Sequence, residues 1–213
     1  AADNTVQLGN TSITNVKTSG TVTAGAVTYI NSVGTNGQVL TTDGAGATSW
    51  AAVAATHAIG DSYGGGIVFF VYDGGQHGLI AATVDQSAGI RWYGGSNTNT
   101  RARADGIGAG LKNTAIIIAN QGPVDGNAFA ATVCNEYSVT VGGVTYGDWY
   151  LPSKYELNLL YIERATVGNS STSFYWSSTE GDNSYAWKHS FNYGNQSLGA
   201  KYNPYYVRAV RAF

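Results

Sequence analysis

A change in amino-acid composition near residue 57 constrains the fold of this 213-residue chain more than any other feature. Residues 1–56 carry only three charges, Asp3, Lys17 and Asp43, and alternating runs such as Thr21-Val22-Thr23 stand between glycines and asparagines. Alternation of this kind predicts short strands and turns. The segment has too few large apolar side chains to form a core alone. We therefore expect a flexible linker or a β-rich stalk completed by neighbouring copies, and we favour the stalk.

One part of this segment supports the stalk interpretation. The run Gly34–Gly44, followed by Trp50, resembles stretches that precede the tip domains of phage tail fibres and bacterial surface proteins. That resemblance implies a homotrimer in which residues 1–56 form the oligomerisation segment. Residues 57–213 then form the second domain.

The second domain opens with a predicted hairpin. Residues 59–72 combine a turn with a strongly apolar strand, Asp73-Gly74-Gly75 makes the next turn, and residues 77–82 supply the answering strand. The glycines at 64–66 precede a strand, whereas a phosphate-binding loop follows a strand and opens a helix. We therefore do not expect a nucleotide site.

Helices are few in the prediction. Residues 111–120 and 127–137 are helical candidates, and a third helix begins after Pro152. There Ser153 and Glu156 have the spacing of a capping box, and an apolar stripe follows at Leu157, Leu160 and Tyr161.

The C-terminal forty or so residues alternate apolar anchors with blocks of Gly, Asn, Asp, Ser and Tyr. Tyrosine supplies rigid contact area, and Ser, Gly and Asn supply adaptable hydrogen bonds, which is typical of a recognition surface. The anchors expected in the core are Trp176, Trp187, Phe191, Val207, Val210 and Phe213. The blocks are residues 181–185, 189–190, 192–193, 197–200 and 202–206. The candidate ligand-binding residues are Asp182, Asn183, Ser184, Tyr185, His189, Asn192, Tyr193, Ser197, Leu198, Tyr202, Asn203, Tyr205 and Tyr206.

Composition argues against several classes of function. With 11 basic residues against 13 acidic ones there is no basic stripe to neutralise phosphates, so nucleic acid is not an expected partner. No window has the ~18 consecutive apolar residues of a membrane span. The single cysteine, Cys134, lies in an apolar run and is expected to be a buried, inert thiol.

Enzymatic chemistry is also not expected. His57, His77 and His189 are scattered over a linker, a turn and a polar block, and no Gly-x-Ser-x-Gly motif accompanies them. Zinc needs several Cys, His or carboxylate ligands at suitable spacing, and the sequence has no such cluster.

Five ordered motifs now identify a family. Residues 64–69, 77–81, 149–157, 175–180 and 207–213 resemble the DUF1566 group of C-type-lectin-fold domains, and the resemblance extends over residues 59–213. It implies an α+β fold: a C-type-lectin-like domain with a small twisted antiparallel sheet, two or three helices and long surface loops.

Within that group the tail is similar to the variable proteins of diversity-generating retroelements. There, errors at template adenines turn AAY codons into many others, but never into those for Lys, Gln, Glu, Met or Trp. All five blocks obey this restriction. The resemblance implies a variable region at about residues 175–206, with Trp187, Gln196 and Lys201 in the constant frame.

Calcium needs separate treatment, because sugar-binding C-type lectins hold it with Glu-Pro-Asn or Gln-Pro-Asp and Trp-Asn-Asp tripeptides. None occurs here, and Tyr202-Asn203-Pro204 lacks the carboxylate. We expect no cofactor at the usual lectin site. A structural calcium stays open, because backbone carbonyls can supply its ligands.

The sequence thus predicts a non-enzymatic recognition protein, trimeric and stalked. Its partner would be a bacterial surface protein or glycan, and its place the tip of a phage tail fibre. The alternatives are a bacterial cell-surface adhesin or lipoprotein, and a structural virion decoration protein.

Overall fold

The computed structural model describes residues 22–30, 32–122, 124–169 and 171–213, and the chain divides into two compact units. Unit 1 is Ala1–Ala54 and unit 2 is Ala55–Phe213, a division close to the boundary predicted at residue 56. The predicted strands and turns of residues 1–21 lie outside the described residues.

Unit 1 contains two hairpins. β1 (Val22–Ala24) pairs with β2 (Val27–Tyr29), and β3 (Gln38–Thr42) pairs with β4 (Thr48–Ala52), both antiparallel. Two-stranded hairpins are marginally stable alone, and these bury little apolar area. The large apolar side chains that this unit exposes are Val22, Tyr29, Val33, Val39, Leu40 and Val53.

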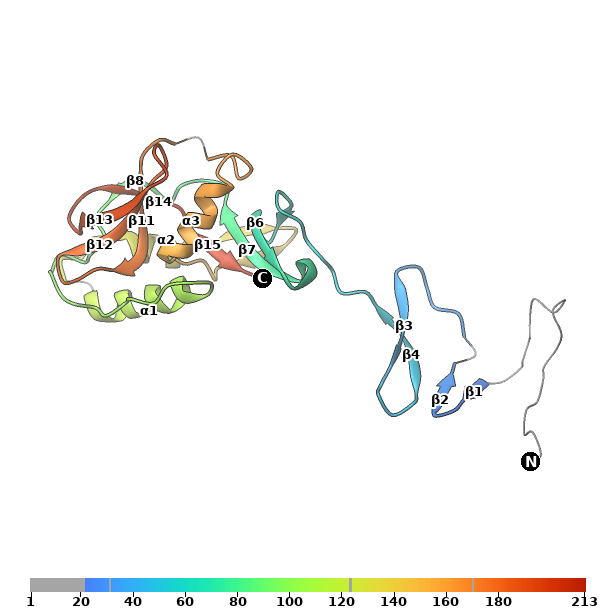
Figure 1. The fold of residues 1–213 in the computed structure, drawn as a ribbon. Coiled ribbons are helices and arrows are strands. Elements are labelled where there is room, and N and C mark those ends of the chain that lie inside the picture. Colours follow the sequence, from blue (N-terminus) through green and yellow to red (C-terminus); the bar gives the residue numbers. More distant parts are fainter. Residues whose placement is uncertain (1–21, 31, 123, 170) are drawn as a thin grey trace, which may run out of the picture. The chain divides into compact units, whose positions relative to one another are not determined.

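Unit 2 begins with a four-stranded antiparallel sheet in the order β15-β7-β6-β5. Its strands are β5 (Ser62–Tyr63), β6 (Gly66–Tyr72), β7 (His77–Ala82) and β15 (Val210–Ala212). A 3-10 turn, η1 (Asp73–Gly75), joins β6 to β7, so the predicted hairpin is confirmed. Figure 1 shows β6, β7 and β15 side by side.

Close backbone approach explains the last of the three glycines, Gly66, which is the first residue of β6. A Cβ atom at Gly66 would lie 2.1 Å from the carbonyl oxygen of Ala81 on the neighbouring strand. Only glycine lets the two backbones come this close.

A second sheet of five strands follows in the order β13-β12-β11-β14-β8. Its strands are β8 (Ser87–Ile90), β11 (Phe174–Glu180), β12 (Tyr185–Ser190), β13 (Gln196–Ala200) and β14 (Tyr205–Val207). β11 and β14 pair in parallel, which corrects the prediction of a purely antiparallel sheet. The parallel contact consists of one residue pair, Tyr175 with Tyr206. A further hairpin joins β9 (Val139–Val141) to β10 (Val144–Tyr146).

Three α-helices occur in the described part of the chain: α1 (Ala109–Gln121), α2 (Ala130–Asn135) and α3 (Lys154–Ile162). α1 and α3 confirm the predicted helices, whereas α2 is shorter than the predicted 127–137. It starts late because Thr132 Oγ1 accepts the Phe129 N–H at 2.9 Å, which fixes the helix start.

The predicted capping box of α3 is confirmed. Ser153 Oγ accepts the N–H of Glu156 at 3.2 Å, and Glu156 Oε2 accepts the N–H of Ser153 at 2.8 Å. Leu157 and Leu160 of the predicted stripe are buried, and Tyr161 is half-buried. α3 contacts β6, β11 and β12, so it links the two sheets of unit 2.

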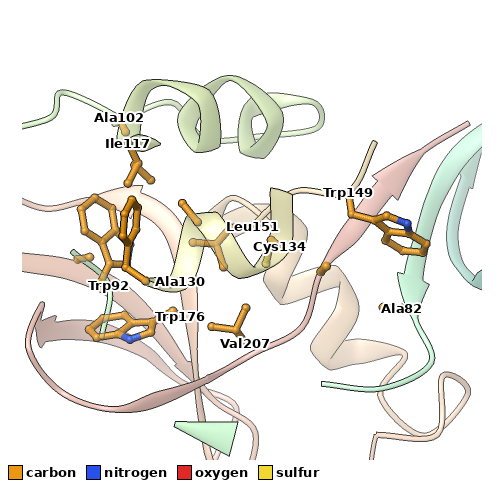
Figure 2. Close-up of a cluster of buried hydrophobic side chains, with 14 of the residues drawn as sticks. Ala82, Trp92, Ala102, Ile117, Ala130, Cys134, Trp149, Leu151, Trp176 and Val207 are labelled. Atoms are coloured by element: carbon orange, nitrogen blue, oxygen red, sulfur yellow. The ribbon is translucent and has the colours of Figure 1, made fainter. Parts of the chain in front are cut away.

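Two buried apolar clusters hold unit 2 together. One gathers Phe69 and Leu79 of the four-stranded sheet with Leu157 of α3, Tyr175 and Phe191. In the other, Figure 2 shows Ile117 pointing from α1 toward Trp92, with Trp176 and Val207 near Ala130 of α2. Cys134 is fully buried there as predicted, and burial raises the pKa of its thiol. The result is a mixed α/β architecture with three helices and several small sheets.

Candidate functional site

The predicted recognition residues fall into four groups by position and burial, of which the first and third are in contact, since Asn203 Nδ2 donates to the Tyr205 hydroxyl at 3.0 Å. The first lies where β12 begins and β13 ends. Asp182 Oδ1 accepts the N–H groups of Ser184 at 2.7 Å and Tyr185 at 2.9 Å, which closes the loop between β11 and β12. The Lys201 N–H donates to the Ser184 carbonyl at 2.9 Å, so this loop and the turn after β13 lie together.

Strand pairing adds side chains to the same place. Tyr185 pairs with Ala200 and Trp187 with Leu198 across β12 and β13. Tyr185 is 44% exposed, Leu198 46% and Tyr202 66%. We call this surface the Tyr202 patch; it consists of Asp182, Asn183, Ser184, Tyr185, Leu198, Tyr202 and Asn203.

The second group, Asn192 and Tyr193, is exposed at the opposite end of the same hairpin. β12 has six residues, so about 20 Å separates this turn from the Tyr202 patch at the usual strand rise. Tyr193 is 79% exposed and therefore available for contact. It cannot share one small contact area with Tyr202.

The third group is half-buried: Ser197, Tyr205 and Tyr206. The ring of Tyr205 lies 4.6 Å from that of Trp176 and 5.4 Å from that of Phe174. Tyr205 therefore packs on the core through one side of its ring.

His189 forms the fourth group, and its predicted place on the displayed surface is corrected by the structure. Its side chain is fully buried and stacks on Tyr161 of α3 with ring centroids 4.6 Å apart. Neither ring nitrogen has a hydrogen-bond partner among the described residues. Burial, with a smaller contribution from the Arg164 charge, lowers the pKa of His189 to about 4, so the ring is neutral at neutral pH.

A buried ion pair fixes the backbone beneath the Tyr202 patch. Lys201 Nζ lies 2.7 Å from Glu180 Oε1, and both side chains are fully buried. Glu180 also accepts the N–H groups of Thr100 at 2.8 Å and Arg101 at 2.7 Å, and Lys201 donates to the Thr98 carbonyl at 3.0 Å. Burial lowers the pKa of Lys201, and the hydrogen bond to Glu180 opposes that shift. The pair ties the residue before Tyr202 to a segment a hundred positions earlier.

Comparison with known families now adds an independent finding. The model of the Lcl C-terminal domain matches residues 81–211, more than half of the chain. The chain belongs to the Lcl C-terminal domain family. Comparison with curated proteins gives no match. The family match begins in β7 and ends in β15, so it contains every candidate ligand-binding residue, and it favours a surface or adhesin-type domain.

In this Lcl C-terminal domain, Trp187 is a surface-facing aromatic residue that the sequence analysis missed. It was expected in the core but is half-buried, and Lys154 Nζ lies 4.5 Å from the centre of its ring. Its pairing with Leu198 places it beside the Tyr202 patch. The alternation of Tyr185 and Trp187 along one strand was the available signal, since residues two apart share a face. Trp176, Phe191, Val207 and Val210 are buried as predicted, and Phe213 is half-buried against the core.

Glu156 and Glu180 are the two buried carboxylates among the described residues of the Lcl C-terminal domain. Glu156 accepts the N–H groups of Gly108 at 2.8 Å, Gly110 at 3.2 Å and Ser153 at 2.8 Å, and the Tyr150 hydroxyl at 3.1 Å. Burial raises its pKa, and these donors oppose the rise. The carboxylate therefore holds the N-terminal ends of α1 and α3 together, which is a structural role.

No group of three or more His, Cys, Asp or Glu side chains in the described residues is placed to hold a metal ion. None of the described helices has the length and apolarity needed to cross a membrane.

Proposed function

We propose that the chain is a non-enzymatic ligand-recognition domain with a C-type-lectin-like fold, which binds through the Tyr202 patch. The single observation that carries this proposal is the contrast between Lys201, fully buried in an ion pair, and its exposed neighbour Tyr202. A rigid backbone that presents exposed tyrosine and asparagine side chains is what a binding surface requires.

The chemistry of the patch supports binding of a macromolecule. Tyr185, Leu198 and Tyr202 supply apolar and aromatic area, and the 182–184 loop supplies hydroxyl, amide and carboxylate groups. Aromatic side chains dominate the energy of many interfaces, and truncation of one commonly costs ~2 kcal/mol or more of binding free energy. The ligand that fits is a molecule on a bacterial surface, contacted by the tip of a phage tail fibre.

Retroelement diversification of this patch is the second part of the proposal. Asp182, Asn183, Tyr193 and Tyr202 are exposed and lie in the predicted variable blocks, whereas the buried Glu180 and Lys201 lie outside them. Substitution at the exposed positions would therefore leave the core unchanged. His189 and Gly199 are buried members of those blocks, so we expect them to vary less than Tyr193 and Tyr202.

A genomic observation tests the diversification. We expect a near-copy of the DNA for residues 175–213 beside a reverse-transcriptase gene, with adenines wherever the two copies differ. Sibling sequences that are identical at the exposed block positions would contradict it and would favour a structural decoration protein.

Unit 1 supports a trimeric stalk. Its hairpins expose Val39 and Leu40 of β3 and Val22 of β1, and additional copies of the chain would cover such side chains. A trimer would raise avidity by roughly 10²–10⁴-fold through effective concentration alone. The mass of the full chain in solution, measured by sedimentation, checks this. A stable monomer with residues 1–56 intact would contradict the trimer.

Binding itself can be tested on bacterial cells. Labelled full-length chain should bind a susceptible strain, and Tyr202→Ala should reduce that binding by about tenfold or more. Tyr72→Ala is the matched control, because Tyr72 is 48% exposed on β6, in the other sheet. Equal loss of binding in both variants, or in neither, would rule out the Tyr202 patch as the contact surface.

A bacterial cell-surface adhesin is the second candidate, and membership in the Lcl C-terminal domain family favours it. The binding surface would be the same, but unit 1 would act as a spacer from the cell envelope. Tail-assembly genes beside the coding sequence support the tail-fibre assignment, and a lipoprotein signal in the complete gene supports the adhesin.

A further inference from the structure

A loop that carries two exposed arginines runs beside the Tyr202 patch. The carbonyl of Ala102 in this loop accepts the N–H of Glu180, the last residue of β11, at 2.8 Å. The loop therefore contacts the chain directly before residues 182–184 of the patch. Ala102 is fully buried, whereas Arg101 and Arg103 on either side of it are exposed.

The buried Glu180 carboxylate holds this loop and the patch together. Its Oε2 accepts the N–H of Arg101 at 2.7 Å, and its Oε1 lies 2.7 Å from Lys201 Nζ. One carboxylate group thus positions both Arg101 and the residue before Tyr202. An Arg101 side chain held in this way is close to any ligand that binds on the patch.

Arg101 has a backbone conformation that arginine rarely adopts. Its φ is +64°, in the left-handed region that favours glycine. The hydrogen bond from its N–H to Glu180, and a longer one to Asn99 Oδ1 at 3.2 Å, keep it there. Strained conformations of this kind persist where the surrounding structure fixes them, and they cluster at functional sites. Glycine would be the residue of lowest strain at this position, so an arginine here points to a use for its side chain.

Positive charge is left over at this edge of the patch. Five other cationic side chains of unit 2 have carboxylate partners, but among the described residues neither Arg101 nor Arg103 has one. Burial lowers the pKa of Lys201 most, and among the smaller influences Asp182 raises it and Arg103 lowers it, so both charges lie near this ammonium. The buried pair is neutral as a whole. Two arginines against one aspartate therefore leave a small excess of positive charge.

From these contacts we infer that Arg101 is a specificity-determining residue of the recognition surface, and that the partner is a bacterial surface protein with an exposed Asp or Glu carboxylate. The planar guanidinium group fits a carboxylate through two parallel hydrogen bonds. Arginine and tyrosine are also the side chains enriched at protein–protein interfaces and among their hot spots. A polyanion fits less well, because many cations are needed to hold it and the local excess of charge is small.

This inference rests on the proposed function and names the class of its partner. Arg101 and Arg103 lie outside the variable blocks, so the cationic edge would stay constant while the Tyr202 patch changes. Each variant of the patch would then select among partners that carry a carboxylate at the same place.

Binding of the labelled full-length chain to a susceptible bacterial strain tests the role of Arg101. Arg101→Gly removes the guanidinium and suits the positive φ, so this variant should fold and should bind about tenfold or more weakly. Arg101→Lys keeps the charge without the planar fork and should recover only part of the binding. Unchanged binding by Arg101→Gly, together with a loss in Tyr202→Ala, would overturn the inference and leave the proposed function standing. Unchanged binding in both variants would overturn both.

Arg164→Gln is the matched control for the loss of one positive charge. The Arg164 guanidinium lies 4.2 Å from the centre of the Tyr161 ring, and a Cβ atom at Gly194 would lie 2.6 Å from the Tyr161 hydroxyl. Arg164 is therefore near the turn at the opposite end of the β12–β13 hairpin, and its substitution should leave binding unchanged. An equal loss in Arg164→Gln and Arg101→Gly would show an effect of overall charge and would overturn the inference.

Salt dependence separates a charged contact from a structural role of Arg101. Raising NaCl from about 0.05 to 0.5 M should weaken binding of the parent chain more than that of Arg101→Gly, because salt screens the contact that the variant lacks. Equal salt dependence in the two chains would overturn the inference.

Treatment of the cells before binding identifies the partner class. Amidation of cell-surface carboxyl groups with a carbodiimide and glycinamide should abolish binding, and so should digestion of surface proteins with a protease that is then washed away. Periodate oxidation of surface sugars should leave binding unchanged. Binding that survives amidation or proteolysis, or that is lost on periodate oxidation, would refute a protein carboxylate as the partner group.

Discussion

Lys201 and Tyr202 are adjacent in sequence and opposite in environment. The Lys201 side chain is fully buried against Glu180, whereas Tyr202 is 66% exposed. The ion pair between Lys201 and Glu180 holds the backbone in place, and the exposed Tyr202 side chain is not needed for that. Under the proposed function, stability and recognition therefore depend on neighbouring residues, and not on separate regions of the domain. Substitutions of the buried residues should therefore change the unfolding free energy strongly, and substitutions of the exposed residues should change it little.

The largest effect is expected from breaking the buried pair. Lys201→Met leaves the Glu180 carboxylate buried without its cationic partner, and Glu180→Gln does the same to the Lys201 ammonium. Removal of one partner of a buried pair usually costs about 3–5 kcal/mol of unfolding free energy. Urea denaturation followed by tryptophan fluorescence measures it. A loss below ~1 kcal/mol in both variants would show that the pair does not hold the backbone under the patch.

Acid should destabilise the domain through His189. Folding lowers the pKa of His189 from 6.5 to about 4. Between these two pH values the unfolded chain therefore binds a proton at His189 that the folded chain does not bind. Stability is therefore complete above pH 6.5 and falls as pH decreases toward 4. The shift corresponds to ~3 kcal/mol at most, at 1.36 kcal/mol per pKa unit.

The controls for this pH effect are two substitutions. His189→Phe should remove the part of the pH dependence between pH 6.5 and 4, while other groups keep theirs. His77→Gln should leave it unchanged, because the His77 side chain is 52% exposed. Identical pH profiles for His189→Phe and the parent chain would mean that His189 does not titrate as its burial requires.

Local signals explain which parts of the fold could be predicted. The hairpin of β6 and β7 and the capping box at Ser153 depend on residues a few positions apart, so the sequence displays them directly. The same holds for the exposed loop at 182–184, whose residues favour turns.

Long-range contacts explain what could not be predicted. Glu180 accepts a hydrogen bond from Thr100 and pairs with Lys201, and Arg208 pairs with Asp85. These partners are far apart in sequence, so no local sequence pattern predicts the contacts. β14 pairs in parallel with β11 through Tyr175 and Tyr206, which are 31 positions apart, and composition does not reveal such a pair. The polar residue type of His189 predicted a surface position, but Tyr161 of α3 covers its ring.

A smaller effect is expected at Gly199, a buried position of β13 next to the exposed Leu198. A Cβ atom there would lie 2.9 Å from Lys188 Cδ and 2.9 Å from Tyr205 Cε2, so Gly199→Ala forces both side chains to move. Overpacking of this kind costs about 1–3 kcal/mol, and we expect the lower half of that range because Lys188 is flexible. Leu198→Ala is the control and should change the unfolding free energy less. If Leu198→Ala were the more destabilising of the two, Leu198 and not Gly199 would be the neighbour that stabilises the fold.

The smallest effect on stability is expected at the exposed tyrosines themselves. Tyr202→Ala and Tyr193→Ala should each change the unfolding free energy by no more than about 0.5 kcal/mol, as surface substitutions usually do. The two residues lie at opposite ends of the β12–β13 hairpin, so their effects should add in the double variant. Thermal denaturation of the single and double variants measures this directly. A cost of ~2 kcal/mol at Tyr202 would show that its ring stabilises the fold, and the patch could then not be exchanged without loss of the scaffold.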